Sequence, residues 1–270
     1  MSERVGWDAL PGGLRQAVEA RTGEVIESEV VTEGLNCSTA LVLHTQRNGR
    51  FFLKGVRESQ LDEVAALRME ELINPTVRGI AATIRHSARA AGWYCLVFAH
   101  LDGRHADLST GEDLAAIGWT LRLMHCLRVP DFPVPPLVER YAGYLEPGEK
   151  ELLSGGHLLH TDTNPHNLMI GSRGGSAYVI DWAMPALGPV WVDAAYTAVR
   201  LMECDQTPES ARQWLASFPA WRQADPRAVK ALVEVTCRHW SDKVGESGAA
   251  GSNARFRHLL EFPHEPPNGL

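Results

Sequence analysis

The residues best suited to chemistry gather in one stretch of the sequence, between His160 and Asp181. Two short apolar runs, NLMI and YVID, are separated there by the turn-forming residues 172–175, a pattern that predicts a β-hairpin. If the runs pair antiparallel, Asn167 lies opposite or nearly opposite Asp181 at the open end of the hairpin. An amide oxygen and a carboxylate placed in this way form a partial site for Mg²⁺, which completes its shell with water and substrate phosphates.

Asp162 lies five residues before Asn167, in a loop rather than in a strand. It can therefore approach the substrate that the metal holds, and the spacing predicts that it is the general base. His160, Asp162 and His166 could instead bind a transition metal, because imidazole and carboxylate at close spacing are ordinary zinc ligands. A zinc site would leave Asn167 and Asp181 without a role, so Mg²⁺ on a nucleotide phosphate is the favoured interpretation.

Two motifs in this stretch resemble the aminoglycoside phosphotransferase family, whose members share the protein-kinase-like fold. HTDTNPHN, residues 160–167, is similar to the family's H-x-D-x-x-x-x-N catalytic loop, and DWA, residues 181–183, is similar to its short metal-binding motif. The resemblance implies transfer of the γ-phosphoryl group of ATP or GTP to a hydroxyl, with Mg²⁺ as the metal. It assigns the catalytic role to Asp162, metal binding to Asn167 and Asp181, and structural roles to His160 and Asp193.

The same resemblance extends to the first hundred residues. Lys54 is similar to the family's phosphate-binding lysine, and Glu63 to the acid that pairs with it, with Glu70 or Glu71 on the same helix as alternatives. GLNCST, residues 34–39, resembles a nucleotide-positioning loop, and LVFAHLDG resembles a hinge that contacts the base through its main chain. The further nucleotide-binding residues implied are Ser38 and Thr39 in the loop, and Phe98, Ala99 and Leu101 in the hinge.

Two departures from the family pattern concern the catalytic loop and the segment after the metal motif. Family members often have glycine after the loop histidine, so Thr161 and His166 fill space that is commonly left empty. After Asp181 no segment resembles a phosphorylatable activation loop, which argues against a protein kinase.

The elements that must position these residues change in character near residue 100. Before it, the pattern is strand-like with one helical stretch, residues 60–73, which Asn74 and Pro75 end. Asn48-Gly49 predicts a two-residue hairpin turn that places Lys54 late in the returning strand. After it, helical periodicity predicts helices at about 111–128, 137–153, 190–203, 208–217 and 226–243.

These patterns predict an α+β protein with a β-rich N-terminal lobe and a mainly helical C-terminal lobe. We place the nucleotide-binding lobe at residues 1–99 and the catalytic and substrate-binding lobe at residues 100–270. The formal net charge of −7 argues against nucleic acid as a partner, because that affinity comes from cationic side chains. Five dispersed cysteines favour a reducing compartment, and no signal peptide or membrane-spanning run is present, so we expect a cytoplasmic location without a membrane partner.

The acceptor is expected to be a cationic antibiotic of the aminoglycoside or cyclic-peptide kind, which would confer resistance. Carboxylates of the C-terminal lobe could bind its ammonium groups. A metabolic kinase acting on an amino alcohol, amino acid or sugar is the alternative, and a nucleotide-binding regulatory module without catalysis is an alternative of another class. The candidate acids are Glu203, Asp205, Glu234, Asp242, Glu261 and Glu265.

Overall fold

The computed structural model describes residues 4–32 and 37–261, and the chain divides into two compact units. Unit 1 contains residues 1–104 with the segments 171–174 and 178–184, and unit 2 contains the remainder. The predicted lobes, 1–99 and 100–270, differ from these units because Asp181 and its motif belong with unit 1. The predicted α+β composition is confirmed, with an antiparallel sheet in the first part of the chain and mostly helices in the second.

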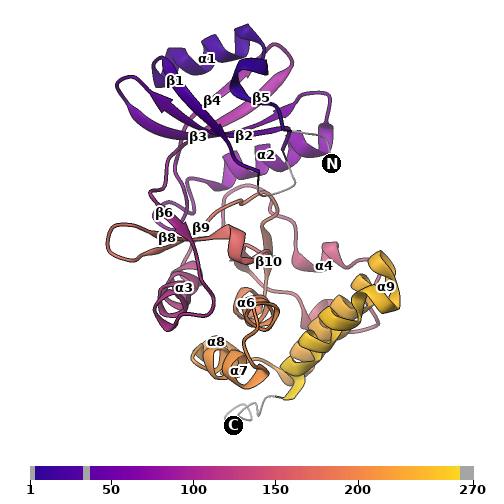
Figure 1. Ribbon diagram of the computed structural model, residues 1–270. Coiled ribbons are helices and arrows are strands. Elements are labelled where there is room, and N and C mark those ends of the chain that lie inside the picture. The colour runs from indigo at the N-terminus through magenta and orange to yellow at the C-terminus, as the bar shows by residue number, and fades with distance from the viewer. Residues whose placement is uncertain (1–3, 33–36, 262–270) are drawn as a thin grey trace. The chain divides into compact units, whose positions relative to one another are not determined.

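Unit 1 is built on a five-stranded antiparallel sheet with the strand order β1-β2-β3-β5-β4. Its strands are β1 (Val25–Val30), β2 (Thr39–Thr45), β3 (Gly49–Arg57), β4 (Ile84–Ala90) and β5 (Trp93–Ala99), and its helices are η1 (Trp7–Ala9), α1 (Gly12–Thr22) and α2 (Leu61–Ile73). Figure 1 shows α1 and α2 on opposite faces of this sheet.

The two faces of the sheet carry different side chains because successive residues of a strand point to opposite sides. In the register of β3 with β5, Lys54 pairs with Leu96 and Phe52 pairs with Phe98, so these four residues share one face. The core on this face includes Leu96, Phe98 and α2 residue Leu67. The core on the other face joins Leu14 and Val18 of α1 to Leu41, Leu43, Leu53 and Val97.

Two sequence expectations for unit 1 were wrong. The helix α1 was not predicted, because its sequence GGLRQAVEART begins with two glycines and carries few apolar residues. The hairpin between β2 and β3 is not closed by a two-residue turn, since Thr45 pairs with Gly49 and residues 46–48 form the loop. Gly49 adopts the left-handed conformation, with φ of 76°, as the glycine of a three-residue hairpin loop does.

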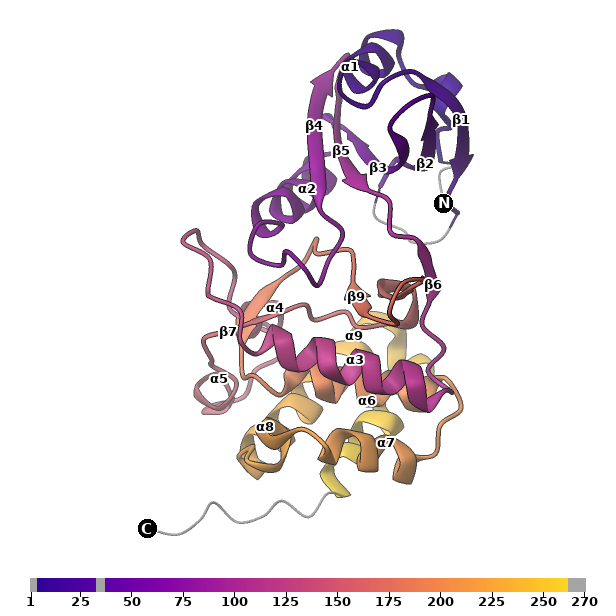
Figure 2. The same ribbon diagram turned by 90° about the vertical axis from the view of Figure 1, so that its left-hand side faces the viewer.

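Unit 2 is mainly helical, and Figure 2 shows α3, α6 and α7 side by side. Its helices are α3 (Gly111–Met124), α4 (Leu137–Arg140), α5 (Glu149–Leu152), η2 (Pro165–Asn167), α6 (Val192–Glu203), α7 (Pro208–Ala216), α8 (Pro219–Arg222), α9 (Pro226–Arg257) and η3 (His258–Glu261). The antiparallel pair β7 (His157–Leu159) and β10 (Ala186–Gly188) leads directly into His160. A small sheet that belongs wholly to neither unit has the order β6-β8-β9, formed by β6 (Gly103–His105), β8 (Leu168–Gly171) and β9 (Ala177–Val179).

The helix predicted at 137–153 is instead two single turns, α4 and α5. Gly148 has φ of 86° and so interrupts the helical path before α5. The helix predicted at 226–243 extends to Arg257 across a kink at Gly245, where φ is 76° and ψ is 161°. The second half was missed because its glycines, serines and asparagine are weak helix formers. Within residues 4–32 and 37–261, no helix is long and apolar enough to cross a membrane.

Candidate active site

Unit 1 holds a buried cluster of charges around Lys54. Its ammonium lies 2.8 Å from a carboxylate oxygen of Glu70 on α2 and 2.5 Å from one of Asp181. Lys54 and Glu70 are 7% and 4% exposed, whereas the Asp181 side chain is 29% exposed. The cluster thus presents one carboxylate to solvent and buries the other with the lysine.

The charges of the cluster keep Lys54 protonated. Burial lowers the pKa of Lys54, but the carboxylates of Glu70 and Asp181 outweigh it and hold that pKa above its ordinary value. Burial raises the pKa of Glu70, against the opposing effect of the Lys54 ammonium. A lysine held charged in this way can bind an anionic ligand such as a phosphate.

The expectation that Glu63 pairs with Lys54 was wrong, because Glu70 makes that contact. The two acids lie seven residues apart on α2, so they share a helix face but are separated by about 10.5 Å along its axis. Periodicity could not distinguish them. Glu63 instead accepts a hydrogen bond of 3.1 Å from the Ser38 hydroxyl and one of 3.0 Å from the Gln60 amide, and so ties α2 to the loop before β2.

The expected nucleotide-positioning loop is described only in part, because Gly34, Leu35 and Asn36 lie outside the described residues. Ser38 is half-buried, and its hydroxyl donates to Glu63. Its expected contact with a nucleotide phosphate stays a prediction. Thr39 is fully buried, and its hydroxyl donates to the carbonyl of Val5 at 2.6 Å. The side chain of Thr39 lies on the same face as Leu41, opposite Lys54, which corrects its expected contact with the nucleotide.

The hinge residues lie at the end of β5. Phe98 is buried on the Lys54 face and packs against Phe52, with ring centroids 6.0 Å apart. The Ala99 amide donates to the carbonyl of Thr83 at 2.8 Å, so only its carbonyl could accept a bond from a base. Leu101 is half-buried beyond the strand. Base binding by Phe98, Ala99 and Leu101 stays a prediction.

The backbone next to Lys54 is tightly packed at Gly55. A Cβ atom at this position would lie 2.5 Å from Cys95 Sγ and 2.9 Å from Thr39 Cγ2, closer than real Cβ contacts come. The absence of a side chain therefore lets β3 lie between its neighbours with Lys54 in register.

In unit 2, Asp193 binds the start of the loop at residues 160–167, whose catalytic role stays a prediction. This buried residue of α6 accepts hydrogen bonds of 2.8 Å from the backbone amides of both His160 and Thr161. Burial raises the pKa of the Asp193 carboxyl, and the two amide bonds act in the opposite direction. These contacts are the ones that its expected structural role requires.

The carboxylate of Asp162 is oriented by two side-chain amides. Asn164 donates to one oxygen at 3.0 Å, and Asn167 donates to the other at 3.1 Å. The buried His160 ring accepts a bond of 3.3 Å from the Asp162 backbone amide through Nδ1. The Asp162 side chain remains 37% exposed, so it can still meet a substrate.

Two residues of the candidate site have the left-handed backbone conformation without being glycine. Thr161 has φ of 71° and Asp181 has φ of 63°. This conformation costs a β-branched residue such as threonine about 1–2 kcal/mol. Strain of this kind is found at functional sites, where the surrounding contacts maintain it.

The donor set of the expected metal ligands fits a hard cation. Asn167 makes its two bonds to Asp162 through the amide nitrogen, so its oxygen is the atom suited to a cation, and Asp181 supplies a carboxylate. The two residues lie in different units, and their facing arrangement stays a prediction. Across the part of the chain that the structure describes, no group of three His, Cys, Asp or Glu residues could hold a metal ion.

Sequence reasoning missed two residues that contact Asp162. Asn164 caps the turn η2, its oxygen accepting from the His166 amide, while its nitrogen binds Asp162. An asparagine directly before a proline is a typical start of a helical turn, so this signal was available. Arg200 lies 3.8 Å from Asp162, a contact across 38 residues that no local pattern predicts.

Comparison with known sequences supports the resemblance. Residues 149–227, which include Asp162, Asn167, Asp181 and Asp193, match the phosphotransferase enzyme family, abbreviated APH. The resemblance seen in the loop and the DWA motif is therefore confirmed. No curated protein sequence matches the chain.

Solved structures show the fold. The choline kinase LicA from Streptococcus pneumoniae has a TM-score of 0.60 at 12% identity, over 92% of this chain and 99% of that one. An aminoglycoside phosphotransferase from Alicyclobacillus acidocaldarius gives 0.58 at 14% identity, over 95% and 97%. The GDP complex of an aminoglycoside 2′-phosphotransferase gives 0.60 at 12% identity, over 91% and 94%. The expected protein-kinase-like fold is confirmed.

Proposed function

We propose that the protein transfers the γ-phosphoryl group of ATP or GTP to a hydroxyl group of a small molecule. The observation that carries the proposal is the Asp162 carboxylate, which is partly exposed and oriented by amides from Asn164 and Asn167. A carboxylate held in this way can align an acceptor hydroxyl and receive its proton. The match of the surrounding segment to the phosphotransferase enzyme family supports the same reaction.

The Lys54 cluster would bind the nucleotide phosphates. In the proposal, the Lys54 ammonium exchanges its contact with Asp181 for phosphate oxygens and keeps its contact with Glu70. Asn167 and Asp181 would hold Mg²⁺, which when bound neutralises charge on the phosphates. The proton of the acceptor passes to Asp162, and the transfer is direct, without a phosphorylated enzyme.

The acceptor is proposed to be cationic, as aminoglycosides are. Three of the candidate acids already contact a cation, since Glu203 pairs with Arg200, Glu234 with Lys230 and Glu261 with Arg212. Asp242 differs because its contact is the neutral hydroxyl of Tyr144, at 2.6 Å.

Asp242 is therefore proposed as a ligand for an ammonium group, and Asp205, which lies exposed just after α6, is a second candidate. Asp242 lines a cavity of 410 Å³ in unit 2 together with a second carboxylate, that of Glu246, and with the side chains of Arg238 and Arg257. Glu265 lies outside the described residues.

A metabolic kinase for an amino alcohol is the second candidate. It is favoured by the likeness to choline kinase LicA, whose TM-score equals that of the aminoglycoside enzyme with GDP. Both acceptor classes contain a cationic nitrogen and a hydroxyl, so Asp242 suits either. If the acceptor is an antibiotic, the protein would confer resistance to it.

Nucleotide consumption by the full-length protein, measured with Mg²⁺ and a panel of aminoglycosides, cyclic peptides, choline, ethanolamine, amino acids and sugars, tests the proposal. We expect turnover stimulated by one acceptor class, and a phosphorylated product detected by mass spectrometry. Nucleotide binding without turnover across the panel would instead indicate a non-catalytic regulatory module. Asp181→Asn should lose Mg²⁺-dependent nucleotide binding, whereas Asp162→Asn should keep it.

A further inference from the structure

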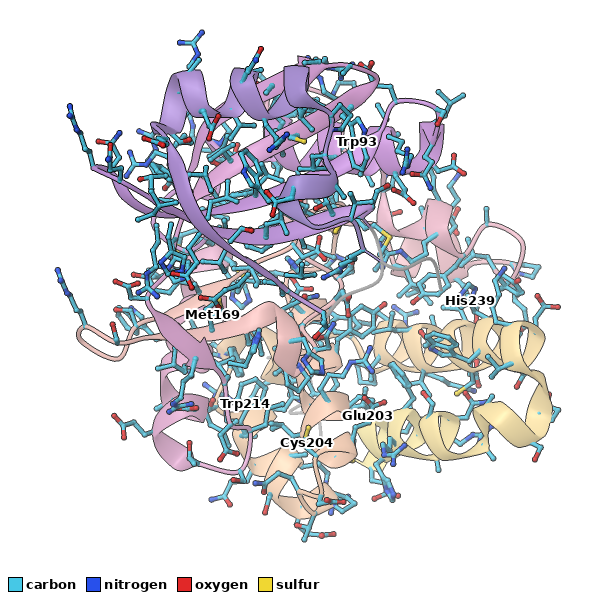
Figure 3. The ribbon with its side chains drawn as sticks, turned by 45° about the horizontal axis from the view of Figure 1, so that its top comes forward. Trp93, Met169, Glu203, Cys204, Trp214 and His239 are labelled. Carbon is cyan, nitrogen blue, oxygen red and sulfur yellow. The ribbon has the colours of Figure 1, made fainter. Side chains whose placement is uncertain are left out.

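Arg200 stands between two carboxylates in the last turn of α6. Its guanidinium lies 2.6 Å from a carboxylate oxygen of Glu203 and 3.8 Å from Oδ1 of Asp162. The first distance is a charge-assisted hydrogen bond, and the second is too long for one. Figure 3 labels Glu203, the last residue of α6, next to Cys204, which caps the C-terminal end of that helix.

The two contacts use different nitrogens of the guanidinium, Nη1 for Glu203 and Nη2 for Asp162, so a bidentate bond to Asp162 would require Arg200 to leave Glu203. A guanidinium binds a carboxylate best in a bidentate way, which would place two N–H donors on Asp162. Asn164 and Asn167 already donate one bond to each oxygen of that carboxylate. Each carboxylate oxygen has two lone pairs, so two further hydrogen bonds from Arg200 would occupy the remaining one on each oxygen. The acceptor hydroxyl could then no longer donate to Asp162.

The side chains involved are exposed enough to rearrange. Arg200 is 33% exposed, Glu203 27% and Asp162 37%, so a change of rotamer requires no opening of the core. Arginine also has many rotamers, and the difference between the two distances is small compared with the reach of its side chain.

We propose that Glu203 is a positioning residue that holds Arg200 away from Asp162 and thereby keeps the Asp162 carboxylate available to the acceptor hydroxyl. The proposal rests on the proposed function, in which Asp162 accepts the hydroxyl proton. It gives Glu203 a role different from acceptor binding, which the sequence had suggested.

The test compares four full-length proteins: wild type, Glu203→Gln, Arg200→Gln and the double variant. Glu203→Gln releases Arg200 to bind Asp162, so we expect kcat to fall on the order of tenfold while the KM for the nucleotide stays unchanged. Arg200→Gln should remain within about threefold of wild type, and the double variant should regain that level. Added salt should partly restore Glu203→Gln, because the new ion pair is exposed to screening.

A matched control is available in the same unit. Glu209 and Arg212 form an ion pair with the same spacing of three residues, at 2.8 Å on α7. Glu209→Gln should leave kcat unchanged, and thermal unfolding should show that all variants fold. If Glu203→Gln proves unstable, Glu203→Ala with and without Arg200→Gln gives the same comparison.

Three results would overturn the proposal. Glu203→Gln could keep full kcat, or its loss could persist in the double variant with a raised KM for the acceptor, as expected of a substrate ligand. Arg200→Gln alone could also lose more than tenfold, which would make Arg200 itself necessary. Failure of the proposed function is separate, because the wild type would then show no acceptor-stimulated transfer, whereas failure of the Glu203 proposal leaves wild-type transfer intact.

Discussion

The two units organise their functional carboxylates in opposite ways. In unit 1, Glu70 is buried against the Lys54 ammonium, and ionic contacts dominate. In unit 2, Asp162 is partly exposed, and its hydrogen bonds come from the neutral amides of Asn164 and Asn167. The contrast is consistent with two different roles. The buried Lys54 cluster suits the binding of phosphate, whereas the oriented and accessible carboxylate of Asp162 suits proton exchange.

The energetic consequences of the contrast also differ. Removing one member of a buried ion pair leaves a charge without compensation and destabilises the fold. Removing the charge of an exposed carboxylate costs the fold little but removes the chemistry that the group performs. Variants can therefore distinguish the Lys54 cluster from Asp162 by whether stability or activity changes.

The largest expected effect is on turnover, in Asp162→Asn. We expect kcat to fall by about 10²–10⁴-fold, because asparagine cannot accept the hydroxyl proton. The free energy of unfolding, measured in urea, should change by less than about 1 kcal/mol. A variant that retains most of its kcat would show that Asp162 is not the base.

Glu70→Gln should give the largest loss of stability. We expect the free energy of unfolding to fall by about 3 kcal/mol, because Lys54 stays buried with one of its two carboxylates missing. Glu63→Gln on the same helix is the matched control and should cost less than about 1 kcal/mol. Equal losses in the two variants would contradict the pairing of Lys54 with Glu70.

His125 should make stability sensitive to acid. Burial, together with the positive charges of His157 and Arg122, lowers the pKa of His125 from 6.5 to about 4. Between these values the unfolded chain binds a proton that the folded chain does not, so stability falls as the pH drops from about 6.5 to about 4. The effect should be at most about 1–2 kcal/mol, because the ring is only partly buried.

Urea unfolding at several pH values would measure this dependence in wild type and in His125→Gln. The variant should show a flatter slope between pH 6.5 and 4, since glutamine does not titrate. An unchanged slope would assign the acid sensitivity to other groups.

The smallest effect concerns Thr161, which occupies the left-handed conformation. Thr161→Gly removes about 1–2 kcal/mol of strain but adds about 0.5–1 kcal/mol of chain entropy to the unfolded state. We expect a net gain below about 1 kcal/mol in thermal unfolding. Ala91→Gly, at a turn with φ of 51°, is the control for glycine at a left-handed position in unit 1. A loss above about 1 kcal/mol in Thr161→Gly would mean that Thr161 is held by packing rather than strained.

Local patterns predicted much of the fold. Alternating apolar residues identified the strands of the five-stranded sheet, and helical periodicity identified α2, α3, α6 and α7. The errors arose where composition and structure disagree, as in the glycine-rich second half of α9. Glycine and proline between Arg140 and Glu149 likewise broke a helix that the pattern had joined.

The site was predictable where its residues follow one another closely in sequence. The spacing of Asp162 and Asn167 was sufficient to predict that both belong to one loop, although their hydrogen bonds to each other were not predicted. Choosing between Glu63 and Glu70 as the partner of Lys54 requires the position of each acid along the axis of α2. Hydrophobic periodicity identifies the face of a helix but not that position. Arg200 contacts Asp162 only because α6 packs beside the loop, and that is a property of the tertiary structure.

Because of the close packing at Gly55, a substitution at this position depends on the residues at two others, Cys95 and Thr39. Any side chain there meets Cys95 and Thr39 before it meets solvent, so a substitution at residue 55 requires smaller neighbours on two adjacent strands. Related sequences that replace Gly55 should therefore also have smaller residues at the positions of Cys95 and Thr39. Gly55 thus restricts which substitutions its neighbouring strands tolerate, although it has no side chain that could bind a ligand.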